Sequence, residues 1–439
     1  MELLEKVKKL LEEKNILLTG GGGVGKSYLT TELISSLRRE AKQVVVLGST
    51  GVSAVNVNGH TIHSFFCFGI SNNLQEMKKN DKYTKQRVKE LNKILYAADL
   101  LVIDEISMVS SDLMEMILYR LKSGSFDGRL LFVGDFFQLP PVKSRVQKDD
   151  SLFANREFAF ESDAWDYFEP YIVELTRTKR TQDEEFFHIL SRIRRGELDN
   201  EVGNYLESLR EHTNVRDENP TILYGRNREA DIVNLKRLEE LKSEPVLLKA
   251  KEKVHFASLH VKRIESWKKN LPVPAELTLK VDASVLFCTN KWGSYYNGER
   301  GRVIKLDEDE VIVEKVNGKV VKVKRAEYTL SESITLNGKI EEKPLVSLEQ
   351  FPLKLAYAIT IHKSQGMSID SLVCNIDNIF EKSQFYVAIS RAKNPKQLIL
   401  DYSYENFPNH LRRCIQVSQK VVEFYEKSKV DRIEEDTLF

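Results

Sequence analysis

NILLTGGGGVGKSYLT, residues 15–30, joins a short apolar strand to a helix through a run of glycines. Within it, Gly20–Ser27 matches the pattern G-x-x-x-x-G-K-S in the strand-to-helix context that gives the pattern its meaning. Glycines let backbone N–H groups curl around an anion at the amino end of a helix, where Lys26 reaches phosphate oxygens and the Ser27 hydroxyl reaches magnesium. A glycine-rich helix cap would need neither the lysine nor the serine. The segment therefore predicts a phosphate-binding loop in an α/β fold.

Outward from this loop, short apolar runs alternate with amphipathic stretches up to residue 134, which is typical of a parallel α/β sheet. The runs are QVVVLGS, DLLVIDE and RLLFVGD, with helices expected from about Lys26 and Ser111. A polar, lysine-rich stretch, QEMKKNDKYTKQRVKE, separates the second run from the third. We expect this stretch to leave the sheet as a small subdomain.

Acidic and amide side chains follow two of these runs, at the strand ends where parallel sheets bind ligands. Asp104 and Glu105 end LLVIDE, and Asp135 and Gln138 lie in LLFVGDFFQLPPV. In the standard assignment for a phosphate-binding loop, Asp104 holds the metal and Glu105 faces the attacking water. Gln138 is then a candidate to position that water or to sense the γ-phosphate.

A second α/β pattern begins after about residue 178 and returns near the carboxyl end, with a different pattern between them. The second pattern includes DEEFFHILSRIRR, PTILYG, NREADIVNLKRLEEL, LKLAYAIT, SLVCNID and KQLILDY. From about 285 to 350, period-2 alternation is broken by the turn pairs Asn297-Gly298, Asn317-Gly318 and Asn337-Gly338. These features predict a β-barrel-like insertion in a second α/β region.

Composition excludes several classes of protein. The 439 residues exceed one ordinary core, since domains average roughly 150 residues. No apolar run is long enough to span a membrane, and the four cysteines never form a C-x-x-C pair. The amphipathic start, MELLEKVKKLLEEKN, is expected to be an ordinary first helix, and no targeting signal is seen, so we expect a cytoplasmic, nucleoid-associated protein if the source is bacterial. A net charge of +1 gives no argument for nucleic acid.

Seven motifs in order resemble the superfamily 1B Pif-type DNA helicases (petite integration frequency family), with the RecD-type helicases as the nearest related group. They are GGGGVGKS, STGVSAVNVNGHTIHSFF, LVIDEISM, FVGDFFQLPPV, ELTRTKRTQDEEF, AYAITIHKSQGMSID and FYVAISRA. The resemblance covers residues 15 to 401, nearly the whole chain. TIHKSQGMSID and YVAISRA are the most specific of these motifs.

The resemblance implies two RecA-like P-loop lobes, a small wedge insertion in the first lobe and an SH3-like β-barrel insertion in the second. On this scheme, residues 1–64 and 96–178 form the first lobe and 65–95 form the wedge. Residues 179–290 and 346–439 form the second lobe, and 291–345 form the barrel.

The same resemblance implies ATP and Mg²⁺ as cofactors. The residues that it places around ATP are Gly22, Gly23, Val24, Gly25, Lys26, Ser27, Tyr28 and Gly366, with Ser27 and Asp104 on the metal. The residues to which it gives a part in hydrolysis are Lys26, Glu105, Gln138, Arg180 and Arg391. Arg180 of TKRTQD and Arg391 of AISRA match two arginine fingers that reach the γ-phosphate from the second lobe. Thr181 replaces a glutamine common in relatives, so the match is closer for Arg391.

For nucleic acid, the match implies 5′-to-3′ movement along single-stranded DNA and unwinding of tailed or forked duplexes. We expect the chain to be a monomer in solution. The residues that it places on the strand are Thr50, Gly51, Thr61, His63, His362, Lys363 and Ser364. Such small donors contact phosphates without reading sequence. The aromatic residues nearby, Phe65, Phe66, Phe68, Phe136 and Phe137, are expected to pack in the core rather than stack on bases. Replication forks, G-quadruplexes, RNA–DNA hybrids and recombination intermediates stay open as natural substrates.

One departure and two alternatives stand beside this interpretation. Relatives carry an adenine-reading glutamine about 17 residues before the loop, where this chain has Leu3 in MELLEKVKK, so the phosphates are better specified than the base. A DNA-stimulated ATPase that acts as a switch or remodeller without unwinding is the main alternative. A P-loop enzyme for small molecules is the other, but nothing in the second α/β region indicates a small-substrate site.

Overall fold

The computed structural model describes residues 2–57, 59–69, 71–141, 156–178, 180–210, 220–255 and 261–433. These residues form two compact units. The first unit takes its described residues from 2–177, 331–345 and 419–433, and the second from 178–330 and 346–418. The chain therefore passes between the units four times, after residues 177, 330, 345 and 418.

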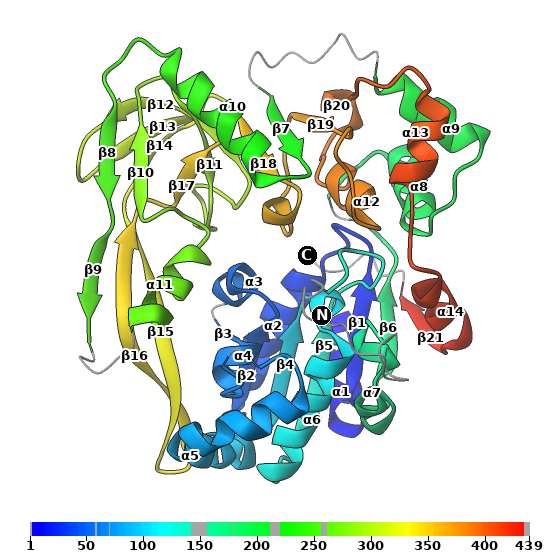
Figure 1. Ribbon diagram of the computed structural model, residues 1–439, viewed down its shortest axis with the longest axis vertical. Coiled ribbons are helices and arrows are strands. Elements are labelled where there is room, and N and C mark those ends of the chain that lie inside the picture. The colour runs from blue at the N-terminus through cyan, green and yellow to red at the C-terminus, as the bar shows by residue number, and fades with distance from the viewer. Residues whose placement is uncertain are drawn as a thin grey trace. The chain divides into compact units, whose positions relative to one another are not determined.

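The first unit is built on a parallel sheet, which within the described residues has the strand order β21-β6-β1-β5-β4-β2-β3 (Figure 1). Its strands are β1 (Ile16–Gly20), β2 (Val44–Gly48), β3 (His60–Thr61), β4 (Leu100–Asp104), β5 (Arg129–Val133), β6 (Tyr171–Leu175) and β21 (Val430–Ile433). Strands β1 and β2 are buried along their whole length, which explains their unbroken runs of Ile, Leu and Val. The parallel sheet predicted from these runs is confirmed.

Helices connect these strands and place polar residues at their carboxyl ends. The helices of this unit are α1 (Glu2–Glu13), α2 (Lys26–Arg39), α3 (Gly51–Asn56), α4 (Ile62–Phe65), α5 (Leu74–Ala97), α6 (Ser111–Ser123), α7 (Asp163–Phe168) and α14 (Gln419–Lys427), with the short 3₁₀ turns η1 (Ile106–Met108) and η2 (Ala159–Glu161). Helices α2 and α6 begin at the residues expected from sequence. Among the described helices, none is both long enough and apolar enough to cross a bilayer.

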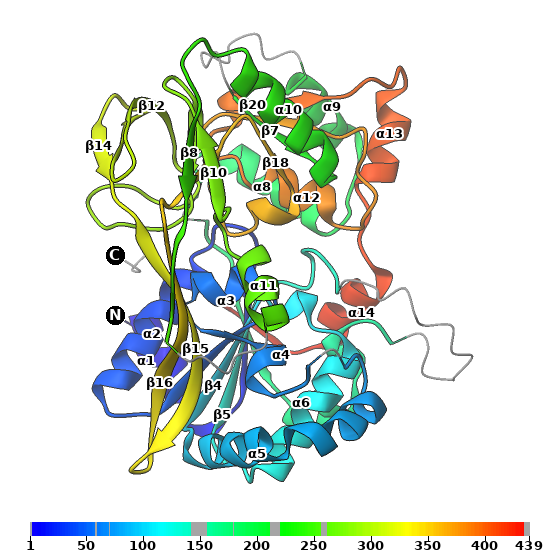
Figure 2. The same cartoon turned by 60° about the vertical axis from the view of Figure 1, so that its left-hand side comes forward.

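The lysine-rich stretch that was expected to leave the sheet forms α5, which lies beside α6 in both views (Figures 1 and 2). Arg120 of α6 holds it in place from a site that is 1% exposed. Its guanidinium donates to the Phe66 carbonyl at 3.0 Å and to the Asp81 carboxylate of α5 at 2.9 Å. The helix bends at Thr84, which has non-helical backbone angles.

The second unit contains a parallel sheet of its own, in the order β18-β7-β19-β20. Its strands are β7 (Thr221–Tyr224), β18 (Ala358–Thr360), β19 (Leu372–Asn375) and β20 (Leu398–Asp401). Its helices are α8 (Glu184–Arg194), α9 (Asn200–Ser208), α10 (Asn227–Glu239), α11 (Val261–Lys269), α12 (Gln384–Ile389) and α13 (Phe407–Cys414), with 3₁₀ turns η3 (His362–Ser364) and η4 (Pro395–Gln397). This is the second α/β region that the sequence predicts.

The antiparallel strands of this unit extend on both sides of the range 291–345 that was predicted for the insertion. An antiparallel sheet in the order β14-β13-β12-β11-β17 begins at residue 284 and ends at 355. Its strands are β11 (Ser284–Phe287), β12 (Arg300–Leu306), β13 (Val311–Lys315), β14 (Val320–Val323) and β17 (Leu353–Leu355). Strand β17 lies far along the chain from β11, its partner, and no local turn signal marks such a pairing. A further pair, β8 (Val246–Lys249) with β10 (Glu276–Leu279), shares its buried core.

The third Asn-Gly turn belongs to a separate hairpin. Asn337 and Gly338 have φ values of 51° and 76° and join β15 (Ala326–Leu336) to β16 (Lys339–Gln350), which also pairs with β9 (Lys251–Val254). Residues 331–345 at its tip belong to the first unit. There Glu342 accepts from His60 at 2.8 Å and Ser333 donates to Glu342 at 2.7 Å.

The predicted second lobe includes residues 346–439, and its last described part lies in the first compact unit. Residues 419–433 belong to the first unit, where β21 pairs in parallel with β6 and α14 lies beside it (Figure 1). The sequence VDRI is short and half polar, and it completes the edge of a sheet whose other strands lie before residue 176. Nothing local in the sequence assigns such a strand to the first lobe.

Candidate functional site

The phosphate-binding loop is fixed between β1 and α2 by glycines in conformations that other residues avoid. Gly20, Gly23 and Gly25 have φ values of 137°, 86° and 95°. A Cβ atom on Gly20 would lie 2.3 Å from the Leu175 carbonyl oxygen of the neighbouring strand, so no larger residue fits there. Helix α2 begins directly at Lys26, with Gly25 as its left-handed N-cap.

Lys26 lies over the loop that precedes it. Its ammonium donates to the Gly20 carbonyl at 2.6 Å and to the Gly21 carbonyl at 3.0 Å. Val24 is buried at 2% exposure, whereas Ser27 is exposed and Tyr28 is 42% exposed. The loop thus offers backbone N–H groups, one ammonium and one hydroxyl to an anion with a bound cation.

The acidic pair lies at the end of β4, one strand beyond β5 in the sheet. Burial, followed by the neighbouring Glu105 charge, raises the pKa of Asp104 to about 7, while the Lys26 charge opposes this shift. Glu105 is held in the left-handed region with φ 54°. A buried carboxyl beside a second acid favours a cation as its partner, so the donor set fits magnesium.

Asp135 and Gln138 follow β5, which lies between β1 and β4. Asp135 is fully buried, and its carboxylate accepts from the Phe137 backbone N–H at 3.1 Å and from the Gln138 amide at 3.4 Å. Phe136 and Phe137 are 1% and 6% exposed. The strand ends therefore bring Asp104, Glu105, Asp135 and Gln138 to the edge of the sheet where the phosphate loop lies.

In the second unit, Arg180 and Arg391 come together although they lie 211 positions apart along the chain. Arg180 donates to the Ser368 hydroxyl at 2.9 Å and to the Ser390 carbonyl at 2.5 Å. Arg391, 2% exposed, donates to the Val387 carbonyl at 2.9 Å and the Ser390 hydroxyl at 2.9 Å. Burial, followed by the Arg391 charge, lowers the pKa of Arg180 to about 9. The Arg180 side chain therefore still carries a positive charge at neutral pH.

In the first unit, the residues predicted to contact DNA also have structural roles, as helix caps and in packing. Thr50 and Thr61 cap α3 and α4, and each hydroxyl accepts from the backbone N–H three residues on, at 3.1 Å from Ser53 and 3.2 Å from Ser64. His63 lies edge-on to Phe68 at 6.0 Å, and burial lowers its pKa, so its ring is neutral at pH 7. Phe65, Phe66 and Phe68 are at most 7% exposed, as expected for core residues. Contact with DNA stays a prediction for Thr50, Gly51, Thr61 and His63.

The corresponding residues of the second unit lie on η3 and the turn after it. His362 stacks near Phe380 at 6.5 Å, and burial lowers its pKa. Lys363 and Gly366 are exposed, whereas Ser364 is fully buried and its hydroxyl donates to the Ile361 carbonyl at 2.7 Å. The Ser364 carbonyl also accepts from Arg391 at 3.5 Å, so the predicted DNA segment and the arginine pair are joined directly.

Three residues that contact these sites were not predicted from the sequence. Ser368 and Ser390 hold the Arg180 guanidinium, and both lie within motifs that had been identified. The third is Tyr425 of α14, which contacts Thr19 at 2.8 Å, immediately before the phosphate loop. No sequence signal connects Tyr425 with Thr19, because 406 residues separate them.

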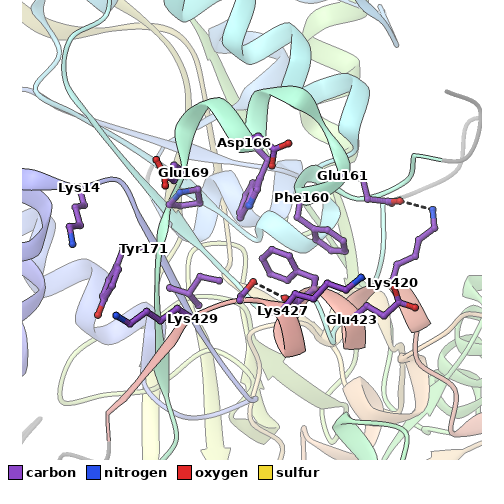
Figure 3. A pocket seen from close by; sticks show the side chains of 15 residues that line it. Lys14, Phe160, Glu161, Asp166, Glu169, Tyr171, Lys420, Glu423, Lys427 and Lys429 are labelled. Carbon is purple, nitrogen blue, oxygen red and sulfur yellow. Dashed lines mark hydrogen bonds and ion pairs between the residues drawn. The ribbon is translucent and has the colours of Figure 1, made fainter.

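A groove of about 910 Å³ on the first unit lies between η2, α7, α14 and the amino end of β6 (Figure 3). Its lining includes Tyr171, the first residue of β6, whereas the phosphate loop follows the carboxyl end of β1. Lysines and acids within it pair with one another, as in Lys420–Glu161 at 2.6 Å and Lys427–Glu423 at 3.3 Å. The groove is therefore separate from the predicted nucleotide site.

A family model described as PIF1-like helicase matches residues 2–204. Among curated proteins, the chain is 41% identical over 438 residues to the ATP-dependent DNA helicase Pif1 of Campylobacter jejuni, with 97% of each chain covered.

The chain is also similar to solved Pif1 structures over nearly its whole length. The structure of Bacteroides sp. Pif1 in complex with ADP-AlF4 has a TM-score of 0.82 at 26% identity and covers 97% of this chain and 96% of that one. Bacteroides Pif1 bound to ssDNA has a TM-score of 0.65 at 26% identity with the same coverage.

Proposed function

The chain belongs to the PIF1-like helicases and is an ATP-dependent DNA helicase with two RecA-like lobes, and from this premise we propose which residues drive it and in which direction it moves. It is a monomer in solution, moves 5′-to-3′ on single-stranded DNA and separates tailed or forked duplexes. The observation that carries the residue assignment is the convergence of Lys26, the Asp104–Glu105 pair and Gln138 at adjoining strand ends of one sheet.

In the first unit, the chemistry needs a cradle, a base and a cation site. The loop N–H groups and Lys26 bind the β- and γ-phosphates, and Gly22, Gly23, Val24, Gly25 and Tyr28 shape the cradle around them. Asp104 and Ser27 would hold Mg²⁺, which when bound neutralises charge on the phosphates. Glu105 accepts a proton from the attacking water, and Gln138 orients that water.

In the second unit, the arginine pair supplies positive charge to the phosphoryl group as it transfers. Arg180 and Arg391 are fixed by serine and backbone oxygens, so little side-chain entropy is lost when they act. Gly366 follows the residues predicted to contact DNA. No atom lies within 4 Å of a Cβ built on Gly366, so there is room for the nucleotide to approach its backbone. This arrangement supports coupling between hydrolysis and grip on DNA.

The DNA path combines residues from both units. Thr50, Gly51, Thr61 and His63 in the first unit, and His362, Lys363 and Ser364 in the second, contact the phosphates of one strand. The ssDNA-bound Bacteroides structure, which shares the fold, supports this proposal. Neutral His63 and His362 can donate hydrogen bonds to DNA phosphates. Such contacts do not depend on the base sequence, because the DNA backbone is the same at every nucleotide.

The test compares ATP hydrolysis with and without single-stranded DNA in the wild-type protein and in Lys26→Ala. We expect strong stimulation by DNA in the wild type. Lys26→Ala should lose turnover by about 10²-fold or more, as when one stabilising donor is removed from a phosphoryl-transfer or oxyanion site, while it still binds an oligonucleotide. A wild-type ATPase that ignores DNA would contradict the proposal, as would substantial turnover by Lys26→Ala.

A further inference from the structure

The carboxyl-terminal helix α14 brings one tyrosine to both walls of the nucleotide site. The Tyr425 hydroxyl is 2.8 Å from the Thr19 hydroxyl, and its ring stacks on Phe137 with centroids 5.0 Å apart and planes 12° apart. Thr19 precedes the phosphate loop, and Phe137 lies in the loop after β5. A single side chain therefore touches the ends of β1 and β5, two of the three strands that carry the predicted site.

On the β1 side, Tyr425 acts on the residue next to the cradle. Thr19 has no exposed surface, so its hydroxyl needs a partner within the protein. The following residue, Gly20, offers the carbonyl that accepts the Lys26 ammonium at 2.6 Å. A shift at Thr19 would move that carbonyl and, with it, the lysine.

On the β5 side, Tyr425 covers the backbone that orients Asp135 and Gln138. The Phe137 N–H donates to the Asp135 carboxylate at 3.1 Å, and the Gln138 N–H donates to the Asp135 carbonyl at 2.8 Å. Phe137 is 6% exposed and held by the stacked tyrosine ring. Restraint of this ring limits the positions open to the Gln138 amide, which catalysis needs within a fraction of an ångström.

Helix α14 is itself fixed well enough to act as a brace. Phe424 stacks on Phe160 with centroids 4.4 Å apart, and Lys420 pairs with Glu161 at 2.6 Å, as Figure 3 shows for the ion pair. Beyond the helix, β21 pairs with β6. Residues before the helix are anchored in the second unit, where the Gln416 carbonyl accepts from the Ser383 N–H at 2.7 Å at the start of α12.

We propose that Tyr425 is a positioning residue for ATP hydrolysis, which keeps the Lys26 end and the Gln138 end of the site in register. The inference rests on the residue assignment made above. It extends the ATPase machinery to a segment that enters the first unit only at residue 419 and carries none of the helicase motifs.

Two single-atom-scale variants test it. Tyr425→Phe keeps the ring and removes the hydroxyl, and Thr19→Val removes the partner in a side chain of the same shape. Each should lower the kcat of DNA-stimulated hydrolysis about tenfold, a fraction of the roughly 10²-fold that a 1 Å misplacement can cost. KM for ATP and affinity for an oligonucleotide should stay near wild type. The double variant should lose no more than either single one, because both remove the same interaction.

Val421→Ala serves as the matched control, since Val421 is buried on the same helix one turn before Tyr425. It should lower the melting temperature as much as Tyr425→Phe or more, with kcat near wild type. The proposal is overturned if all three variants lower the melting temperature but keep kcat, or if the loss lies in KM alone. A wild-type protein without DNA-stimulated turnover would instead contradict the residue assignment and the function proposed above.

Discussion

Asp104 is a carboxyl group enclosed by the protein next to a second acid, and such a group holds its proton more tightly than one in water. Its pKa of about 7 lies above the ordinary 3.8 because of burial and the Glu105 charge. Between about pH 4 and pH 7 the folded chain therefore binds a proton that the unfolded chain has released. The free energy of unfolding consequently falls as pH rises through this window.

Asp104→Asn removes this titrating group and should therefore remove its contribution to the fall in the free energy of unfolding. We expect the variant to gain stability over the wild type as pH rises from 4 to 7.5, by roughly 1 kcal/mol or more. Thermal unfolding of both proteins without nucleotide at several pH values measures the difference. Comparison with the wild type cancels the other groups that titrate in this range. Parallel melting curves for the two proteins across the window would contradict the prediction.

At this scale the sequence predicts the residues that belong to local motifs. Lys26, Asp104, Asp135 and Gln138 each follow a strand that the sequence reveals, and parallel pairing brings strand ends together. Arg180 and Arg391 are assigned by resemblance, and the structure places them side by side. The role of Tyr425 is not predicted, because the sequence pattern of an aromatic residue on an amphipathic helix is the same whether it packs in a core or against a distant loop.

At the scale of elements, the buried Arg120 decides how firmly α5 is held. The guanidinium joins α6, α5 and the segment after α4 through Asp81 and Phe66. The resemblance implies that this region is the wedge, and we propose that it helps to separate the strands. A loosened wedge should affect unwinding more than ATP hydrolysis, which uses residues on the sheet.

Arg120→Met preserves the unbranched aliphatic part of the side chain and removes the guanidinium. The Asp81 carboxylate and the Phe66 carbonyl then lose this donor. We expect a loss of about 1–3 kcal/mol in stability, lower strand displacement and nearly unchanged DNA-stimulated ATP hydrolysis. Glu90→Gln is the control, because Glu90 forms only an exposed pair with Lys93 on the same helix, at 2.9 Å. Equal losses of hydrolysis and unwinding would show that the region does not act as a separate wedge. Unwinding that is absent in the wild type, with hydrolysis present, would favour the switch or remodeller.

Elements with a local signature were predictable, and those that depend on distant partners were not. Asn317-Gly318 closes the β13–β14 hairpin as expected, because Gly318 adopts a positive φ of 78°, which a glycine reaches without strain. LKLAYAIT, by contrast, splits into β17 in the antiparallel sheet and β18 in the parallel sheet. A run of apolar residues does not say which of two sheets will receive it.

At the scale of the whole molecule, direction of movement is the prediction that separates this protein from helicases of opposite polarity. Two lobes that grip phosphates alternately can walk either way, and resemblance to superfamily 1B implies 5′-to-3′. A duplex with a 5′ tail should be unwound and one with a 3′ tail should not. Strand displacement from fluorescent duplexes measures both, with Lys26→Ala as the inactive control. Preference for the 3′ tail would contradict the assignment.

The two-lobe organisation was predictable, whereas the membership of two segments was not. The pattern of strands and helices repeats along the chain, and that repetition indicates two α/β regions. Residues 331–345 and 419–433 join the first unit through contacts such as His60–Glu342 and Thr19–Tyr425, which span 282 and 406 residues. Such pairings follow from the folded topology rather than from any local pattern.

The place of β21 at the edge of β6 has a consequence for synthesis on the ribosome. Strand β6 is complete at residue 175, but its outer neighbour begins only at residue 430. At the usual rate of translation this interval lasts roughly 10–50 s, during which β6 can pair with another nascent chain. Tyr425 is made late in the same interval, so the nucleotide site is completed only after residue 425 has been translated. A chain released early would bury much of its first sheet yet lack both the covered edge and the completed site.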